Sequence, residues 1–149
     1  KHTEVLKVVG IDGKDKMSKS LNNHIELAST PEETTKRVRE MVTDPARIKK
    51  TDPGNPDICN VFTMHKIFSP QEEVDMINTE CRKAGIGCVD CKMRFASNLN
   101  KHLEPFRAKR NELASQESYV KDVLNDGGKR ARVIAQQTMK EVREAMQLP

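Results

Sequence analysis

The sequence has few aromatic residues and no tryptophan: Phe, Trp and Tyr together make up 3% of its 149 positions. A β-sandwich or barrel usually uses more aromatic and β-branched residues, so this composition disfavours those folds. No uninterrupted apolar run of about 18 residues is present, which excludes a membrane-spanning helix. The chain starts at Lys1 rather than methionine, and no apolar signal segment follows. We therefore expect it to be part of a longer protein.

Neither sign of charge dominates the sequence, because 26 basic residues stand against 22 acidic ones. This excess is too small to indicate nucleic-acid binding by itself. It lies in the first and last thirds of the chain, whereas the middle third is slightly acidic and holds all four cysteines. That distribution suits an RNA-binding surface, and an ordinary solvated helix face explains it nearly as well. Cysteines without a signal segment indicate a reducing compartment, the cytoplasm, where metal or cluster ligation is favoured over disulfides.

Helix-start signals are frequent in the first two thirds of the chain. The stretch Thr30–Glu33 offers an N-cap hydroxyl, a proline at the first helical position and a glutamate three residues after the cap. The stretch Ser69–Glu72 repeats this pattern, and another short helix is expected after the loop 52–56. Only Val5–Val9 resembles a strand. We predict an all-α fold, a helical bundle preceded by a short non-helical segment.

The last third of the chain is predicted to contain a long helix from about Val89 to Ala114, kinked at Pro105. Its apolar residues recur at three- or four-residue steps: Phe95, Leu99, Leu103 and Phe106. Tyr119 is expected to pack at the start of a following helix. The stretch Asn125–Gly128 then predicts a turn, with a separate final helix after it.

The segment Gly10–Asn23 is the most informative part of the sequence. Its glycines permit unusual backbone angles, and Lys16 and Lys19 stand three residues apart with serines between and after them. Mobile positive charge beside hydroxyl donors is what a loop needs to bind a polyphosphate. A solvated lysine-rich loop is the alternative interpretation.

The string Lys16-Met17-Ser18-Lys19-Ser20 is similar to the second signature of class I aminoacyl-tRNA synthetases. Its surroundings resemble bacterial tryptophanyl-tRNA synthetases, and the stretches 25–34, 41–47 and 52–62 continue this resemblance. In that family a Rossmann-type catalytic domain precedes a helical domain. The resemblance therefore implies that residues 1–21 are the C-terminal edge of the catalytic domain with its signature loop. It implies that residues 22–149 are the helical domain that binds the tRNA anticodon.

The resemblance also implies a reaction, in which tryptophan and ATP with Mg²⁺ give tryptophanyl-adenylate and pyrophosphate before transfer to tRNA(Trp). Lys16 and Lys19 would neutralise the charge on pyrophosphate, Lys19 most directly. Ser18 and Ser20 would bond phosphate oxygens or hold the loop, and Met17 would pack to position it. The other class I signature and the tryptophan pocket are absent from this sequence, so we expect this part alone to be inactive. The intact enzyme would be a homodimer without membrane contact.

The four cysteines follow the spacing C-x21-C-x6-C-x2-C and are Cys59, Cys81, Cys88 and Cys91. A C-x-x-C pair after a glycine turn presents two thiolates to one ion, so metal or cluster ligation is favoured over buried core thiols. Spacing alone cannot separate tetrahedral zinc from a [4Fe–4S] cluster. A subset of tryptophanyl-tRNA synthetases with four such cysteines carries a [4Fe–4S] cluster. This resemblance makes iron–sulfur the expected group and zinc the alternative.

The resemblance further implies that the helical domain holds the anticodon stem-loop. The basic residues expected to contact RNA are Lys92, Arg94, Lys101 and Arg107, with Lys109 and Arg110 beside them. An ordinary charged helix face is the alternative for each. His65 and His102 are interpreted as polar or core histidines rather than ligands. The alternative from another functional class is a free-standing small iron–sulfur or zinc protein that binds RNA or a partner.

Overall fold

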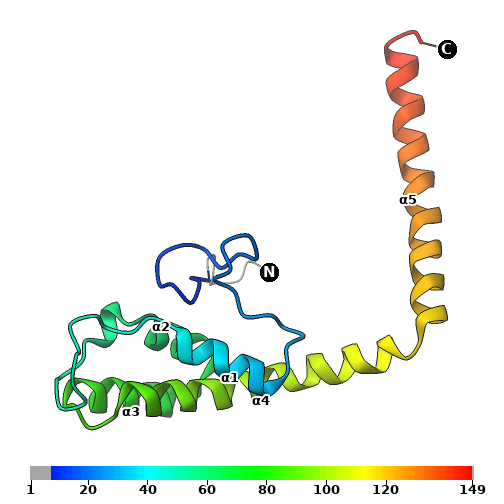
Figure 1. The fold of residues 1–149 in the computed structure, drawn as a ribbon. Helices are drawn as coiled ribbons and strands as arrows, with labels where there is room; N and C mark the ends of the chain where they lie inside the picture. The colour runs from blue at the N-terminus through cyan, green and yellow to red at the C-terminus, as the bar shows by residue number, and fades with distance from the viewer. Residues whose placement is uncertain (1–7, 149) are drawn as a thin grey trace. The chain divides into compact units, whose positions relative to one another are not determined.

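The structure is a computed structural model that describes residues 8–148. Its elements are α1 (Pro31–Glu40), the 3-10 helix η1 (Pro56–Ile58), α2 (Asn60–Phe68), α3 (Gln71–Arg82), α4 (Cys88–Ala114) and α5 (Glu117–Ala145) (Figure 1). No strand forms within the described residues, which confirms the predicted all-α class. The strand-like stretch Val5–Val9 lies largely outside them, and Val9 makes an isolated bridge with Lys16. None of the described helices is long and apolar enough to span a membrane.

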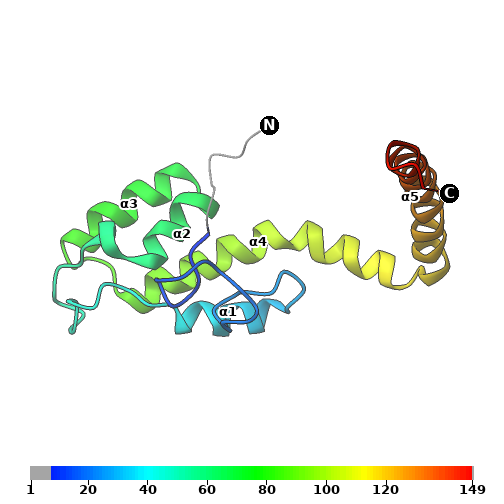
Figure 2. The same cartoon turned by 90° about the horizontal axis from the view of Figure 1, so that it is seen from above.

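The chain consists of two compact units, Lys1–Arg107 and Ala108–Pro149. In the first unit, Figure 2 shows α1 on one side of α4, with α2 and α3 on the other. Its core is drawn from all four helices and from the segment before them. The most deeply buried apolar side chains, each at most 2% exposed, are Val38, Met41, Val61, Ile77, Phe95 and Ala96. His65 lies in this core with its ring 5.3 Å from that of Phe95, as expected for a core histidine.

The start of α1 confirms the predicted capping box. Thr30 Oγ1 accepts a hydrogen bond from the Glu33 amide at 3.2 Å, and the Glu33 carboxylate accepts one from the Thr30 amide at 2.8 Å. The same prediction at Ser69 is wrong, because α3 begins at Gln71 and has no side-chain cap. The Ser69 hydroxyl instead bonds His65 Nδ1 at 2.7 Å and Asn98 Nδ2 at 2.9 Å. Partners from α2 and α4 therefore take the hydroxyl that the local pattern assigns to capping.

The second unit contains α5, which runs without a break from Glu117 to Ala145. The predicted turn at Asn125–Gly128 is wrong, since both glycines lie inside this helix. No residue of α5 is buried, and Tyr119 is 55% exposed rather than packed as predicted. Apolar residues nevertheless recur at helical spacing on both sides of the glycines: Val120 and Val123 are three residues apart, and Ile134 follows Val123 after 11 residues, about three turns. The helical period thus continues where the local turn signal predicts an end.

Replacing Gly127 and Gly128 together by alanine is expected to stabilise α5. A Cβ added at either position meets no heavy atom within 4 Å, and each glycine in a helix interior costs about 1 kcal/mol relative to alanine. The Tm of the helical signal, followed by far-ultraviolet circular dichroism, should therefore rise. The matched control Ala131→Gly in the same helix should lower it. A decrease on replacing the glycines would contradict this and would indicate that another surface approaches the helix closely there.

Candidate functional site

The lysine loop, defined as Gly10–Asn23, folds back on itself. The Gly10 amide donates to the Asp15 carbonyl at 2.8 Å, and the Gly13 amide donates to the Gly10 carbonyl at 3.0 Å. Gly13 adopts a φ of 70°, in the left-handed region that favours glycine. The Met17 amide donates to the Val8 carbonyl at 2.9 Å and closes the base of the loop. The loop therefore has a defined backbone path.

The side chains of the signature string divide into an exposed set and a packed one. Lys16, Lys19 and Ser20 are exposed. Ser18 is half-buried, and its hydroxyl lies 2.8 Å from that of Ser20. Met17 packs against the core, as its predicted positioning role requires. The arrangement leaves both ammonium groups and two hydroxyls available to a polyphosphate. Met17 holds the backbone segment that carries them.

A buried asparagine connects the two sides of this loop. Asn23 is 2% exposed, and its Oδ1 accepts a hydrogen bond from the Ser18 amide at 2.7 Å. Its Nδ2 donates to the Asp12 carboxylate at 2.7 Å. Asp12 also accepts from the Lys14 amide at 3.0 Å. This backbone bond and then the Asn23 bond lower the pKa of Asp12, so the carboxylate stays ionised and keeps both bonds at neutral pH.

Bonds near the start of the lysine loop attach it to the helical body. Asn60, the first residue of α2, donates from Nδ2 to the Gly10 carbonyl at 2.8 Å, and this bond is buried. The Val42 amide, just after α1, donates to the Ile11 carbonyl at 2.9 Å. The Ile11 side chain is itself 7% exposed and belongs to the core.

A further attachment lies near the end of the loop. Arg37 of α1 donates from Nη2 to the Asn22 carbonyl and, at 3.1 Å, to Asn22 Oδ1. The loop is thus bonded to the helical body near both of its ends.

The four cysteines come from three places in the first unit, and none forms a disulfide. Cys59 directly precedes α2, Cys81 lies near the end of α3, and Cys88 and Cys91 lie in the first turn of α4. Burial raises the pKa of the Cys91 thiol to about 12, and the three other cysteines add to this increase. The four thiols therefore share one neighbourhood and act on each other electrostatically.

Two basic side chains border the cysteines. Arg47 Nη1 lies 3.9 Å from Sγ of Cys81 and 3.8 Å from Sγ of Cys88. Burial raises the pKa of the Cys81 thiol, and the Arg47 guanidinium opposes that increase. His65 Nε2 lies 3.6 Å from Sγ of Cys91. Within residues 8–148, no three His, Cys, Asp or Glu side chains lie close enough together to hold a metal ion. Ligation by Cys59, Cys81, Cys88 and Cys91 therefore stays a prediction.

Comparison with known protein families matches residues 3–104 to the tRNA synthetases of class I (W and Y). The chain belongs to this family. It is 45% identical over 148 residues to the tryptophan–tRNA ligase of Aquifex aeolicus, covering 99% of this chain and 37% of that one. It is 42% identical over 141 residues to the ligase of Deinococcus radiodurans, covering 95% and 43%. The chain thus spans less than half the length of these relatives.

A solved structure agrees with this class I assignment. The tryptophanyl-tRNA synthetase of Campylobacter jejuni, in complex with ADP and tryptophan, superposes with a TM-score of 0.82 at 33% identity. The match covers 99% of this chain and 45% of that one. The predicted resemblance is therefore confirmed at the level of the family and of the helical fold.

The four basic residues predicted to contact RNA differ from one another in their surroundings. Arg107 bonds Thr34 Oγ1 at 2.7 Å and Asn100 Oδ1 at 2.9 Å, so its guanidinium joins α4 to α1. Lys92 Nζ donates to the Arg39 carbonyl at 2.8 Å. Arg94 lies 3.6 Å from the Glu73 carboxylate, and Lys101 is exposed. Of the four, Arg94 and Lys101 are the most available for phosphate contact, and RNA binding stays a prediction for all of them.

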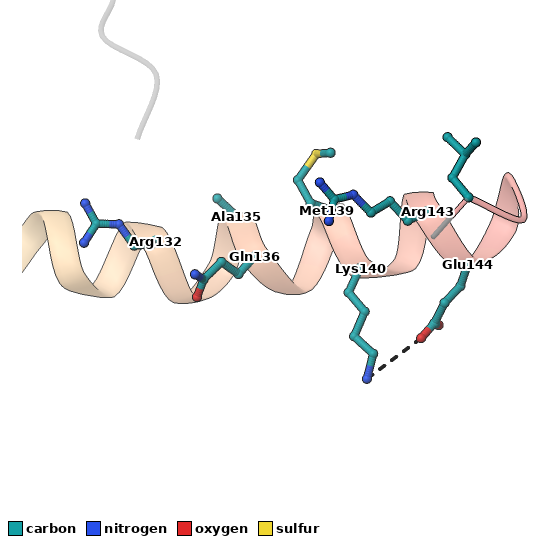
Figure 3. A pocket seen from close by; sticks show the side chains of 8 residues that line it. Arg132, Ala135, Gln136, Met139, Lys140, Arg143 and Glu144 are labelled. Atoms are coloured by element: carbon teal, nitrogen blue, oxygen red, sulfur yellow. Dashed lines mark ion pairs between the residues drawn. The ribbon is translucent and has the colours of Figure 1, made fainter.

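A second group of basic residues lies on α5. A hollow of about 690 Å³ lies along one side of this helix. Figure 3 shows Arg132, Met139 and Arg143 among the side chains that line it. Lys140 also lines it and pairs with Glu144 at 3.8 Å. None of the predicted site residues lines this hollow. Its side chains come from α5 and the residues just after it, so it is a helix surface rather than an enclosed pocket.

The sequence analysis did not identify three polar residues that support the lysine loop and the cysteines: Asn23, Asn60 and Arg47. Asn60 interrupts an otherwise apolar run, and this polar residue among core residues is a signal that could have marked it. Asn23 adjoins the signature loop, but its bond to Ser18 depends on how the loop folds. Arg47 has no distinguishing signal, because its contacts lie 34 and 41 residues away in the chain.

Proposed function

We propose that these residues are the C-terminal part of a tryptophan–tRNA ligase, which activates tryptophan with ATP and transfers it to tRNA(Trp). The lysine loop carries this proposal, because its backbone is fixed while Lys16 and Lys19 stay exposed. The match over residues 3–104 includes the loop together with α1, α2, α3 and most of α4. It leaves the alternative, a free-standing small iron–sulfur or zinc protein, without support.

The proposed chemistry requires positive charge more than it requires a base. The tryptophan carboxylate, already ionised, attacks the α-phosphorus of ATP. A bond between the carboxylate oxygen and the α-phosphorus forms as the bond between the α-phosphorus and the bridging oxygen of pyrophosphate breaks. ATP enters the reaction together with Mg²⁺. Negative charge then grows on the leaving pyrophosphate. Lys19 and Lys16 stabilise that charge, and the Ser18 and Ser20 hydroxyls donate to phosphate oxygens. This part of the protein therefore acts at the leaving group.

The remaining length of the relatives would supply the catalytic domain, including the tryptophan pocket. In this arrangement residues 1–21 form its C-terminal edge, and residues 22–149 hold the anticodon stem-loop of tRNA(Trp). Arg94 and Lys101 would contact RNA phosphates, which arginine and lysine bind without reading sequence. The intact enzyme would work as a homodimer in the cytoplasm.

The resemblance to tryptophanyl-tRNA synthetases with four such cysteines favours an iron–sulfur cluster over a single zinc ion. A tetrahedral zinc ion would hold its four sulfurs at about 2.3 Å. A [4Fe–4S] cube holds its four thiolates further apart. Gly54 leaves space beside Cys81, since an added Cβ would lie 2.6 Å from its Sγ. The buried Nε of Arg47 also has no protein partner.

Cys59, Cys81, Cys88 and Cys91 would hold this [4Fe–4S] group. When bound, it would supply a cross-link between the starts of α2 and α4 and the end of α3. The Arg47 guanidinium opposes the increase that burial causes in the pKa of the Cys81 thiol, because a nearby positive charge stabilises a thiolate. The same residues would hold zinc in the alternative case.

Amino-acid-dependent exchange of pyrophosphate into ATP tests the proposed function in the full-length enzyme. We expect exchange with tryptophan and not with tyrosine, the other amino acid of this family, and we expect charging of tRNA(Trp). The 149 residues alone should show no exchange. Exchange with tyrosine, or none with either amino acid, would overturn the proposal.

A further inference from the structure

We propose that Asn23 and Asn60 are positioning residues for the adenylate-forming step, because together they fix the backbone from which Lys16 and Lys19 extend. This inference rests on the proposed function of the lysine loop. It assigns a role to two side chains that are buried beneath the loop and bond its backbone. Their effect would therefore be transmitted through the loop.

Asn23 acts within the loop. Its Oδ1 accepts from the amide of Ser18 at 2.7 Å, and Ser18 stands between the two signature lysines. Its Nδ2 donates to Asp12 at 2.7 Å and lies 3.4 Å from the Lys16 carbonyl. A single side chain thus bonds the backbone on both sides of Met17. The direction in which each lysine leaves the backbone depends on these bonds.

Asn60 acts from outside the loop. Its Nδ2 donates to the Gly10 carbonyl at 2.8 Å across 50 residues of sequence, and the residue is 7% exposed. Its backbone belongs to α2, a helix of the core, so it gives the loop a rigid support. Without this donor the Gly10 carbonyl would keep only its bond from the Gly13 amide at 3.0 Å, and the loop would lose its attachment to α2.

Gly10 connects the two asparagines. Its carbonyl accepts from Asn60, while an added Cβ would collide with the side-chain amide of Asn23. The absence of a side chain at Gly10 is therefore what lets Asn23 lie against the loop base. The loop backbone is held between one asparagine from its own end and one from α2.

The expected consequence is a change in the rate of the chemical step rather than in tryptophan binding. A misplacement of about 1 Å at a charged group can cost about 10²-fold in rate. Each alanine variant should therefore lower kcat for tryptophan-dependent exchange about 10- to 100-fold. The KM for tryptophan should stay unchanged, since its pocket lies in the catalytic domain.

The experiment compares Asn23→Ala and Asn60→Ala with Asn98→Ala in the full-length enzyme. Asn98 is a suitable control because its part-buried amide also bonds two side chains, Ser69 and Glu73, away from the loop. Asp12→Ala is a second, milder variant, since it removes a partner of Asn23 while leaving the buried residues in place. Tm values identify any variant that has lost its fold.

A second measurement reports the loop itself. Trypsin cleaves after lysine, so the rate of cleavage after Lys14, Lys16 and Lys19 measures how often the loop opens. We expect Asn23→Ala, Asn60→Ala and Asp12→Ala to speed these cleavages several-fold relative to other sites, with kcat reduced. A purely structural role predicts effects like those of Asn98→Ala, and that result would overturn the inference. If the wild-type enzyme shows no tryptophan-dependent exchange, the proposed function fails, whereas the trypsin comparison still tests whether the asparagines hold the loop.

Discussion

The Lys19→Ala variant of the full-length enzyme is expected to lose about 10²- to 10³-fold in kcat for tryptophan-dependent pyrophosphate exchange. Charge grows on pyrophosphate only as the transition state forms, so an ammonium that meets it there raises kcat more than it tightens substrate binding. The structure leaves Lys19 exposed on a fixed backbone. Steady-state exchange at saturating ATP and tryptophan measures the effect, and Lys16→Ala should show a smaller loss.

Lys14→Ala is the matched control for this prediction. Lys14 belongs to the same loop and is also exposed, but the structure uses only its backbone amide, which donates to Asp12 at 3.0 Å. Alanine keeps that amide, so exchange should change less than about twofold if specific placement matters. Equal losses at Lys14 and Lys19 would indicate that the loop contributes only general positive charge.

The elements that could be predicted from the sequence are those whose cause is local. The capping box at Thr30 needs four consecutive residues, and all of its bonds form among them. The similar pattern at Ser69 predicts the start of α3 to within two residues, but its side-chain cap does not form because His65 and Asn98 bond the hydroxyl. A local pattern therefore predicts a capping bond only where no tertiary partner reaches the same group.

The double glycine in α5 shows the opposite failure. Gly127 and Gly128 weaken a helix by a modest amount, about 1 kcal/mol each, and they do not forbid it. The helix on either side continues one apolar period, with Val123 before and Ile134 after the glycines, 11 residues or about three turns apart. A turn signal should therefore be discounted where helical periodicity continues in phase across it.

The residues of the candidate site also fall into two groups, those that the sequence marks and those that only the fold reveals. Lys16, Lys19 and the four cysteines are candidates that a short string and a C-x-x-C spacing single out. Arg47 carries no such signal, since its partners Cys81 and Cys88 lie far away in the sequence. Asn60 is marked as a polar residue in an apolar run, but nothing in the sequence indicates its partner Gly10. Supporting residues of this kind become visible only when the fold brings the segments together.

The Cys88→Ser variant is expected to lose most of the iron and sulfide of the full-length enzyme purified without oxygen. The wild type should contain about four of each per chain, with broad visible absorption. Serine removes one of four thiolate ligands, and the group that joins α2, α3 and α4 is then held incompletely. The Tm should fall with the iron content, because ligand binding to the folded state contributes directly to its stability. Metal analysis, absorption and thermal unfolding on the same samples measure these effects.

Val89→Ser provides the control, since it places the same new residue beside Cys88 at a position that is 65% exposed. It should keep the metal content and the Tm of the wild type. One zinc per chain without colour would contradict the iron–sulfur proposal and would support zinc, the alternative. A folded wild type without any metal would show that the four thiols are core residues. In that case the Arg47 guanidinium would serve its contacts with Cys81 and Cys88 and its bond at 2.8 Å to the Lys50 carbonyl.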